Sequence, residues 1–175
     1  MTTLTQTLRI ATAADAPTLA VFAERTFRET FGRFNRPDDM DEYCAATYTV
    51  ERQRRELADP GRLTLVLENA AQLAAYGQLL AGAAPECVAG EEPIELLRFY
   101  VDKPWHGRGI AHTLMMEVAA AARRRGARTL YLGVWERNLR ALAFYEREGF
   151  RPVGSRPFRL GNKVDTDLLL VRPLV

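Results

Sequence analysis

The sequence predicts a mixed α/β fold in which helices flank a central sheet that is mostly antiparallel. Two observations lead to this prediction. The centre of the chain alternates apolar, strand-like runs with amphipathic helical patterns, and pairs of apolar runs joined by short turns lie on both sides of that centre. The length of 175 residues suits one hydrophobic core, and no repeat or linker divides the chain. We therefore expect a single domain over residues 1–175.

The N-terminal part of the chain is expected to form a short strand and then a long helix. After an apolar run at residues 8–11, Asp15 is a suitable N-cap and Pro17 a suitable first-turn residue. Apolar and aromatic residues then recur every three or four positions, which predicts an amphipathic helix with an inward-facing stripe. The members of this stripe are Leu19, Phe22, Ala23, Phe27, Thr30, Phe31 and Phe34.

Capping residues and helix breakers divide the rest of the chain. Asp38 or Asp39 is expected to cap a second helix and Thr49 a third, and Gly77 inside an apolar run predicts a β-bulge. The elements expected after the first helix are a turn at 35–39, a helix through Tyr43 and Tyr48, a helix at 50–58, an antiparallel hairpin of 63–68 and 73–80, a loop at 81–93, a strand at 94–101, a helix at 109–125, a strand at 128–134, a helix at 138–148 and a final antiparallel pair of 153–158 and 164–171.

Composition and charge exclude several classes of protein. The chain is 47% hydrophobic and 26% charged with a formal net charge of +2, which argues against a nucleic-acid partner. No apolar run reaches the roughly 18 residues of a transmembrane helix, so no membrane contact is expected. Cys44 and Cys87 are the only cysteines and no secretory signal is present, so we expect free thiols and a cytoplasmic location. His106 and His112 lack nearby ligands at metal spacing, and no metal site is expected.

The stretch from Ile94 to Arg125 combines an apolar strand, a glycine-containing turn and a long helix. The first N–H groups of a helix have no intrahelical partner and lie at the positive end of the helix dipole, so they bind anions. Gly107 and Gly109 permit close approach of a ligand, and Arg108 adds a positive charge. The pattern indicates a phosphate site, although an ordinary strand-to-helix turn uses glycine in the same way.

Two motifs together resemble the GCN5-related N-acetyltransferase (GNAT) superfamily. The sequence WHGRGIA at residues 105–111 is similar to the acyl-CoA loop of that superfamily, Gln/Arg-x-x-Gly-x-Gly/Ala. Here His106 replaces the usual Gln or Arg, whereas Gly109 and Ala111 match. The sequence NLRALAFYEREGF at residues 138–150 is similar to the closing motif, and the two motifs occur in the expected order with one predicted strand between them.

Within the superfamily, the pattern of the whole chain is similar to polyamine acetyltransferases of the PaiA type. The matching stretches are TFRETFG, N-x-P-D-D-M-x-x-Y, RFYV, LGVWERN and FRLGNKVDTD, and the resemblance covers Arg9 to Pro173. It implies a single N-acetyltransferase (GNAT) domain whose sheet splays at the acyl-CoA site. It also implies an acetyl-CoA-dependent acetyltransferase acting on a primary amine of a small molecule, with a polyamine such as spermidine as the acceptor.

The resemblance implies roles for residues at the acyl-CoA site. The amide of Val101 would stabilise the oxyanion, Tyr145 would protonate the departing thiolate, and Glu95 would act as general base. Tyr100 and Glu136 are weaker candidates for the general base. Tyr145 could instead be a residue of the hydrophobic core without a catalytic role. Glu95 could instead be a solvated residue at the start of a strand. The residues implied in binding acetyl-CoA are Phe99, Tyr100, Val101, His106, Gly107, Arg108, Gly109, Ile110, Ala111, Asn138, Ala141 and Tyr145.

The acceptor site is expected between the first two helices and the last hairpin, with Phe31, Asp38, Asp39 and Tyr43 as binding residues. The aspartates would attract a polycation, although helix capping explains them nearly as well. Alternative acceptors are protein N-termini, lysines and amino-sugar antibiotics, and alternatives from other classes are a non-catalytic acyl-CoA sensor and a dinucleotide-binding protein. A homodimer is common in the superfamily, and the sequence leaves the oligomeric state open.

Overall fold

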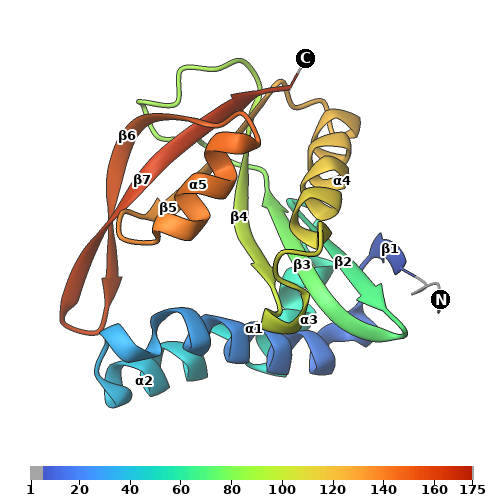
Figure 1. Ribbon diagram of the computed structural model, residues 1–175, viewed down its shortest axis with the longest axis vertical. Coiled ribbons are helices and arrows are strands. Elements are labelled where there is room, and N and C mark those ends of the chain that lie inside the picture. Colours follow the sequence, from blue (N-terminus) through green and yellow to red (C-terminus); the bar gives the residue numbers. More distant parts are fainter. Residues whose placement is uncertain (1–5, 175) are drawn as a thin grey trace.

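The computed structural model describes residues 6–174 as a seven-stranded sheet with helices on both faces (Figure 1). The strand order is β1-β2-β3-β4-β5-β7-β6, and every neighbouring pair is antiparallel except β4 and β5. The strands are β1 (Gln6–Ile10), β2 (Arg62–Asn69), β3 (Gln72–Leu80), β4 (Pro93–Val101), β5 (Thr129–Trp135), β6 (Arg151–Leu160) and β7 (Lys163–Pro173). The helices are α1 (Ala16–Phe31), α2 (Pro37–Thr47), α3 (Val50–Ala58), α4 (Ile110–Arg124) and α5 (Leu139–Arg147), with short 3₁₀ helices η1 (Ala13–Asp15), η2 (Gly32–Phe34) and η3 (Lys103–Trp105).

The predicted fold class, a mixed and mostly antiparallel sheet flanked by helices, is confirmed. Thr49 caps α3 by accepting a hydrogen bond from the N–H of Arg52 at 3.1 Å, as its residue type and position predict. The expected cap of α2 is wrong, because that helix begins at Pro37 and places Asp38 and Asp39 in its first turn. These two carboxylates therefore stabilise the helix through its dipole rather than as N-caps.

The β-bulge expected at Gly77 is also wrong. The extra residue on β3 is Ala74, because Leu67 of β2 pairs with Ala75 and Glu68 with Leu73. In the pairing of β3 with β4, the extra residue lies on β4, between Leu96 and Arg98. Gly77 has a different use, because a Cβ there would lie only 3.0 Å from Cγ2 of Val118 on α4. The absence of a side chain lets α4 pack closely against the sheet.

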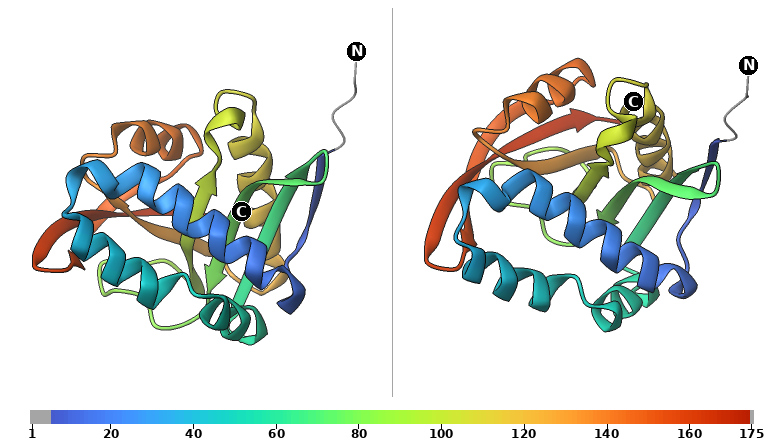
Figure 2. Two further views of the ribbon diagram at one scale, coloured as in Figure 1. Left: turned by 90° about the horizontal axis from the view of Figure 1, so that it is seen from below. Right: turned by 60° about the horizontal axis from the view of Figure 1, so that its bottom comes forward.

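Each face of the sheet has its own hydrophobic core. One cluster joins α4 and α5 to the sheet and includes Leu114, Met115 and Phe150, whereas the second joins α1 and α2 to the opposite face and includes Phe22 and Phe27. Figure 2 shows α1 and α2 crossing the strands on the face that lies away from α4. The predicted inward stripe of the first helix is confirmed at its centre, where Leu19, Phe22, Ala23 and Phe27 are buried.

The sheet opens between β4 and β5. These strands pair only where Pro93–Glu95 lies beside Thr129–Tyr131, and β4 then continues to Val101 paired with β3 alone. Figure 1 shows the two strands diverging, with α5 beside the opening. The remaining edge of β4 offers unpaired backbone groups to a ligand. Among the described residues, no helix has the length and apolar character needed to cross a membrane.

Candidate functional site

A cleft of about 1150 Å³ occupies the opening between β4 and β5 and continues to α1, α2 and the β6–β7 hairpin. One end is bordered by α5 and by the loop that precedes α4, and the other by aromatic side chains of α1 and α2. Residues from both faces of the sheet therefore contribute to one continuous cavity. Its volume is sufficient for an extended cofactor together with a small second molecule.

The loop from Trp105 to Ala111 positions backbone N–H groups at the cleft. Gly107 and Gly109 have φ angles of +72° and +79°, a region that residues with a Cβ rarely adopt. Gly109 is the N-cap of α4, and the first intrahelical bond runs from the N–H of Thr113 to its carbonyl at 3.0 Å. The preceding N–H groups of this first turn are thus available to an anion at the positive end of the helix.

Two predicted binding residues of this loop lie outside the cleft wall. The guanidinium of Arg108 lies over the ring of Trp105, 5.4 Å from its centroid, and Ile110 is buried in the core. Their backbone N–H groups can still contribute to the anion site, whereas their side chains do not line it. The other predicted acyl-CoA residues do line the cleft, namely Phe99, Tyr100, Val101, His106, Gly107, Gly109, Ala111, Asn138, Ala141 and Tyr145.

His106, which departs from the superfamily pattern, joins the loop to the end of β4. Its Nε2 lies 2.7 Å from the carbonyl oxygen of Val101, and because a carbonyl only accepts, Nε2 must carry the proton. The side chain therefore orders the loop next to the open edge of β4. A Gln or Arg side chain also carries N–H donors that a carbonyl can accept.

The backbone of Val101 faces the opening. The next residue, Asp102, donates its N–H to Ala74 on β3 at 2.9 Å. Because successive residues of a strand direct their N–H and C=O groups to opposite edges, the N–H of Val101 points away from β3 and toward the cleft. The bond from His106 to the carbonyl of Val101 agrees with this orientation.

Tyr145 lies on α5 with its ring in an aromatic cluster. It makes edge-to-face contacts with Phe99, Phe144 and Phe150 at centroid distances of 6.2, 5.4 and 5.6 Å. Burial raises its pKa above the ordinary value, because the anionic form loses solvation. The phenol is therefore protonated at neutral pH, as a proton donor must be.

Asn138 begins α5, and its side chain accepts a hydrogen bond from the N–H of Ala141 at 3.2 Å. The capping role considered for this residue is therefore present. Because Asn138 and Ala141 also line the cleft, the same cap holds the start of α5 beside the open edge of β4.

Glu95, the expected general base, does not line the cleft in which an acceptor amine would have to lie. Its carboxylate is 8% exposed, lies outside the cleft wall, and accepts a hydrogen bond from Nη2 of Arg156 at 2.7 Å. Arg156 reaches it across Gly133, where a Cβ would lie 2.7 Å from the same nitrogen. An ion-paired, buried carboxylate is poorly suited to removing a proton, so this geometry does not support the role of general base expected for Glu95.

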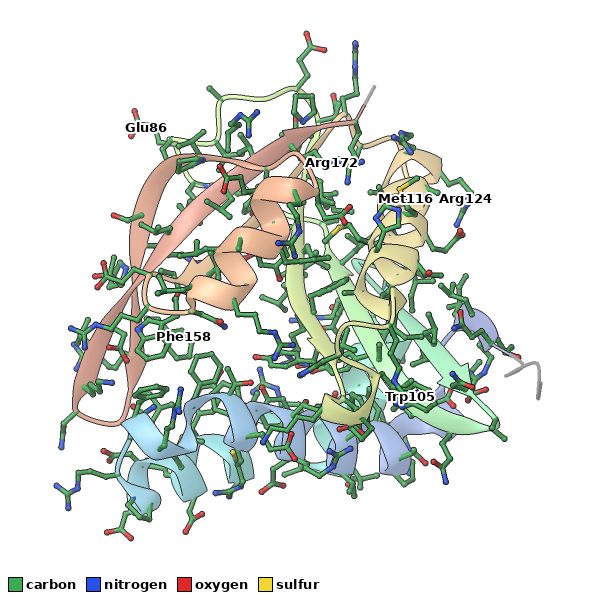
Figure 3. The ribbon with its side chains drawn as sticks, viewed as in Figure 1. Glu86, Trp105, Met116, Arg124, Phe158 and Arg172 are labelled. Atoms are coloured by element: carbon green, nitrogen blue, oxygen red, sulfur yellow. The ribbon has the colours of Figure 1, made fainter. Side chains whose placement is uncertain are left out.

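The end of the cleft beside α1 and α2 contains two of the four residues expected to bind an acceptor. Phe31 and Tyr43 line it, and Tyr43 stacks on Phe27 at 4.9 Å and contacts Phe158 edge-to-face at 5.8 Å. Phe158 projects from β6 toward the helices (Figure 3). The result is an aromatic wall at this end of the cleft.

Asp38 and Asp39, the other two expected acceptor residues, do not line the cleft. Asp38 is exposed, and Asp39 packs against the β6–β7 turn, where a Cβ on Gly161 would overlap its carboxylate. The acidic residues that do line this end are Asp165 and Asp167 on β7. Their spacing of two in the VDTD segment is the sequence signal that both face one side of a strand.

Three features of the cleft match the chemical groups of acetyl-CoA. The free N–H groups at the start of α4 suit a pyrophosphate, the open edge of β4 suits an extended amide-containing arm, and the N–H of Val101 suits a thioester oxygen. The reacting end of the arm would then lie between β4 and Tyr145. Across the sheet, the aromatic and acidic end of the cleft remains available to an acceptor.

Comparison with known proteins supports this interpretation. Residues 23–150 match the model of the acetyltransferase (GNAT) family. An uncharacterized N-acetyltransferase of Mycobacterium tuberculosis is 34% identical over 161 residues, which cover 92% of this chain and 99% of that protein. An uncharacterized N-acetyltransferase of Lactobacillus delbrueckii subsp. lactis is 30% identical over 161 residues, or 92% and 93% of the two chains.

The fold is similar to the crystal structure of the PaiA N-acetyltransferase from Thermoplasma acidophilum in complex with coenzyme A. The TM-score is 0.81 at 19% identity, covering 97% of this chain and 99% of that one. The family model spans more than half of the chain, and a relative with 34% sequence identity matches 92% of it. The chain therefore belongs to the acetyltransferase (GNAT) family and is an N-acetyltransferase.

Proposed function

We propose that the protein transfers the acetyl group of acetyl-CoA to a primary amine of a small molecule. The observation that carries this proposal is the opening between β4 and β5, where backbone donors and Tyr145 lie on one side and the aromatic and acidic end of the cleft lies on the other. A thioester held in the opening would be accessible to an amine from the opposite face. Small aromatic walls and a partly enclosed volume favour a small acceptor over a folded protein.

In this reaction the residues of the cleft would have the following roles. The N–H groups from Gly107 to Ala111 bind the pyrophosphate, and His106 holds that loop against the end of β4. The N–H of Val101 stabilises the negative charge that develops on the thioester oxygen. Tyr145 donates a proton to the sulfur as the carbon–sulfur bond breaks.

A polyamine such as spermidine is the first acceptor to test. The support is the resemblance of the sequence motifs to PaiA-type enzymes and the similarity in fold to a PaiA N-acetyltransferase. The aromatic wall formed by Phe27, Tyr43 and Phe158 adds to this support, because aromatic faces attract ammonium groups.

A thiol-release assay with acetyl-CoA tests the proposal. The panel should contain spermidine, putrescine, n-butylamine, an amino-sugar antibiotic and two peptides that offer an N-terminus or a lysine, with mass spectrometry to identify the acetylated product. We expect turnover with the small amines and little with the peptides. Binding of acetyl-CoA without thiol release on any amine would instead support the acyl-CoA sensor, and failure to bind acetyl-CoA would overturn both.

A further inference from the structure

We propose that Asp167 on β7 receives the acceptor amine and removes its first proton. The inference rests on the proposed function and names the carboxylate that acts as general base at this site in place of Glu95. Two observations support it: Asp167 lines the cleft, and the other carboxylates around it are already in ion pairs.

Asp167 lies at the level of the opening in the sheet. It pairs across strands with Trp135, four residues beyond Tyr131, where the pairing of β5 with β4 ends. The ring of Trp135 contacts Phe31 at 5.9 Å and Phe34 at 4.8 Å, so its side chain is on the face covered by α1. Because directly opposed residues share a face of a sheet, Asp167 is on that face as well.

Tyr145 is on the opposite face, in the core formed with α4 and α5. A base on one side of the opening and an acid on the other correspond to the two proton transfers that acetyl transfer requires. The amine would approach from the side of Asp167, and the sulfur would leave on the side of Tyr145. Both residues line the same cleft.

Of the three carboxylates near this position, Asp167 is the one that remains available. Glu95 is paired with Arg156, and Asp165 is paired with Lys163 at 2.9 Å. Within residues 6–174, no hydrogen bond or ion pair of the Asp167 side chain is found. A half-buried carboxylate without a partner is costly for folding, which is typical of a functional position.

The charged groups around Asp167 set its protonation. Arg156 lies opposite it on β6, Asp165 lies two residues away on β7, Glu95 lies beyond Arg156 on β4, and Arg33 of η2 lines the same cleft. Burial raises the pKa of Asp167 above its ordinary value, Arg156 opposes this, and the two neighbouring acids reinforce it. A carboxylate with a raised pKa is a better acceptor for the proton of an ammonium ion than an ordinary one.

The proton balance is complete with groups that the proposal names. An ammonium ion transfers one proton to the carboxylate of Asp167, and the neutral nitrogen forms a bond to the thioester carbon. The carbon–sulfur bond breaks with its electron pair on sulfur, which takes a proton from Tyr145. The nitrogen loses its second proton, which restores Tyr145 through solvent, and Asp167 releases the first proton to solvent.

The test compares Asp167→Asn with Glu86→Gln, a control that neutralises an exposed carboxylate outside the cleft. With n-butylamine and acetyl-CoA, we expect Asp167→Asn to lower kcat/KM by about 10²–10⁴-fold, the range that general bases contribute, with the Kd of acetyl-CoA unchanged. Glu86→Gln should change kcat/KM by less than about threefold, since its carboxylate is exposed and does not line the cleft.

The pH profile separates a base from a structural residue. In Asp167→Asn, kcat/KM should rise about tenfold per pH unit between pH 6 and 9, following the free neutral amine, whereas the wild-type profile should be flatter. Equal activity and equal profiles for the variant and the wild type would overturn the assignment and leave the acetyltransferase proposal intact.

A binding measurement covers the remaining outcome, in which the wild type binds acetyl-CoA but acetylates no amine. Calorimetric titration of the CoA complex with n-butylamine and with spermidine should then show binding that Asp167→Asn weakens by at least about tenfold. No amine binding, or the same Kd in both proteins, would overturn the assignment of Asp167 as well as the proposed function.

Discussion

Arg156 reaches Glu95 across two intervening strands. Nη2 of Arg156 on β6 lies 2.7 Å from Oε1 of Glu95 on β4, and the strand order places β7 and β5 between them. The guanidinium passes over Gly133 of β5, where a side chain would occupy its position. This single ion pair ties the two sides of the sheet together beside the point at which it opens.

Gly133→Ala should therefore weaken this ion pair. The new Cβ would displace the flexible end of Arg156 and leave a buried carboxylate without its partner, which costs roughly 1–3 kcal/mol. Urea denaturation should show that loss in the free energy of unfolding. Gly32→Ala is the control: its φ of −57° and open surroundings suit alanine, and it should be neutral or stabilising. An equal loss in both variants would show that the ion pair is not the cause.

Tyr145→Phe should lower kcat without weakening acetyl-CoA binding. The ring keeps its contacts with Phe99 and Phe150, and only the proton donor is lost, so a decrease on the order of 10²-fold is expected. Because burial raises the pKa of Tyr145, wild-type kcat should not fall between pH 7 and 9 from loss of this proton. Tyr131→Phe is the control, since Tyr131 lies outside the cleft wall. Unchanged kcat in Tyr145→Phe at every pH would exclude it as the acid.

His106→Ala should weaken the binding of acetyl-CoA. It removes the bond to the carbonyl of Val101, worth about 1 kcal/mol, so the Kd measured by calorimetry should rise about fivefold. His106→Gln restores a donor of the type that the superfamily uses at this position, and its Kd should return to within about twofold of wild type. A Gln variant as weak as the Ala variant would contradict the positioning role.

Asp15→Asn should change how stability depends on pH. Two hydrogen bonds from Arg9, at 2.7 and 2.9 Å, lower the pKa of Asp15 from 3.8 to about 2, so the ionised form stabilises the fold. That contribution should be complete above about pH 5 and should disappear as the pH falls from 3.8 to about 2.

The difference in unfolding free energy between wild type and Asp15→Asn, about 1 kcal/mol at pH 6, should therefore shrink in acid. Glu86→Gln serves as the control, because Glu86 projects into solvent from the loop before β4 (Figure 3). A wild-type advantage over Asp15→Asn that stays constant from pH 6 down to pH 2 would refute the linkage.

Local sequence determined the helices, the caps of α3 and α5 and the glycine turn of the acyl-CoA loop. Thr49 and Asn138 bond to N–H groups three residues ahead, and Gly107 and Gly109 adopt positive φ at the turn that the motif indicated. These features depend on residues only a few positions apart, so periodicity and capping preference are sufficient to predict them. The antiparallel pairs joined by short turns were predictable for the same reason.

Only the tertiary structure decided which charged residues meet at the site. Glu95 and Arg156 are 61 residues apart, and their pairing follows from β7 being inserted between β5 and β6. The same strand order brings Asp167 to the cleft, while the packing of α2 against the last hairpin keeps Asp39 away from it. Hydrophobic patterning tells which face of a strand is buried, but it does not specify the order of strands in a sheet, and that order determines the neighbours of each carboxylate.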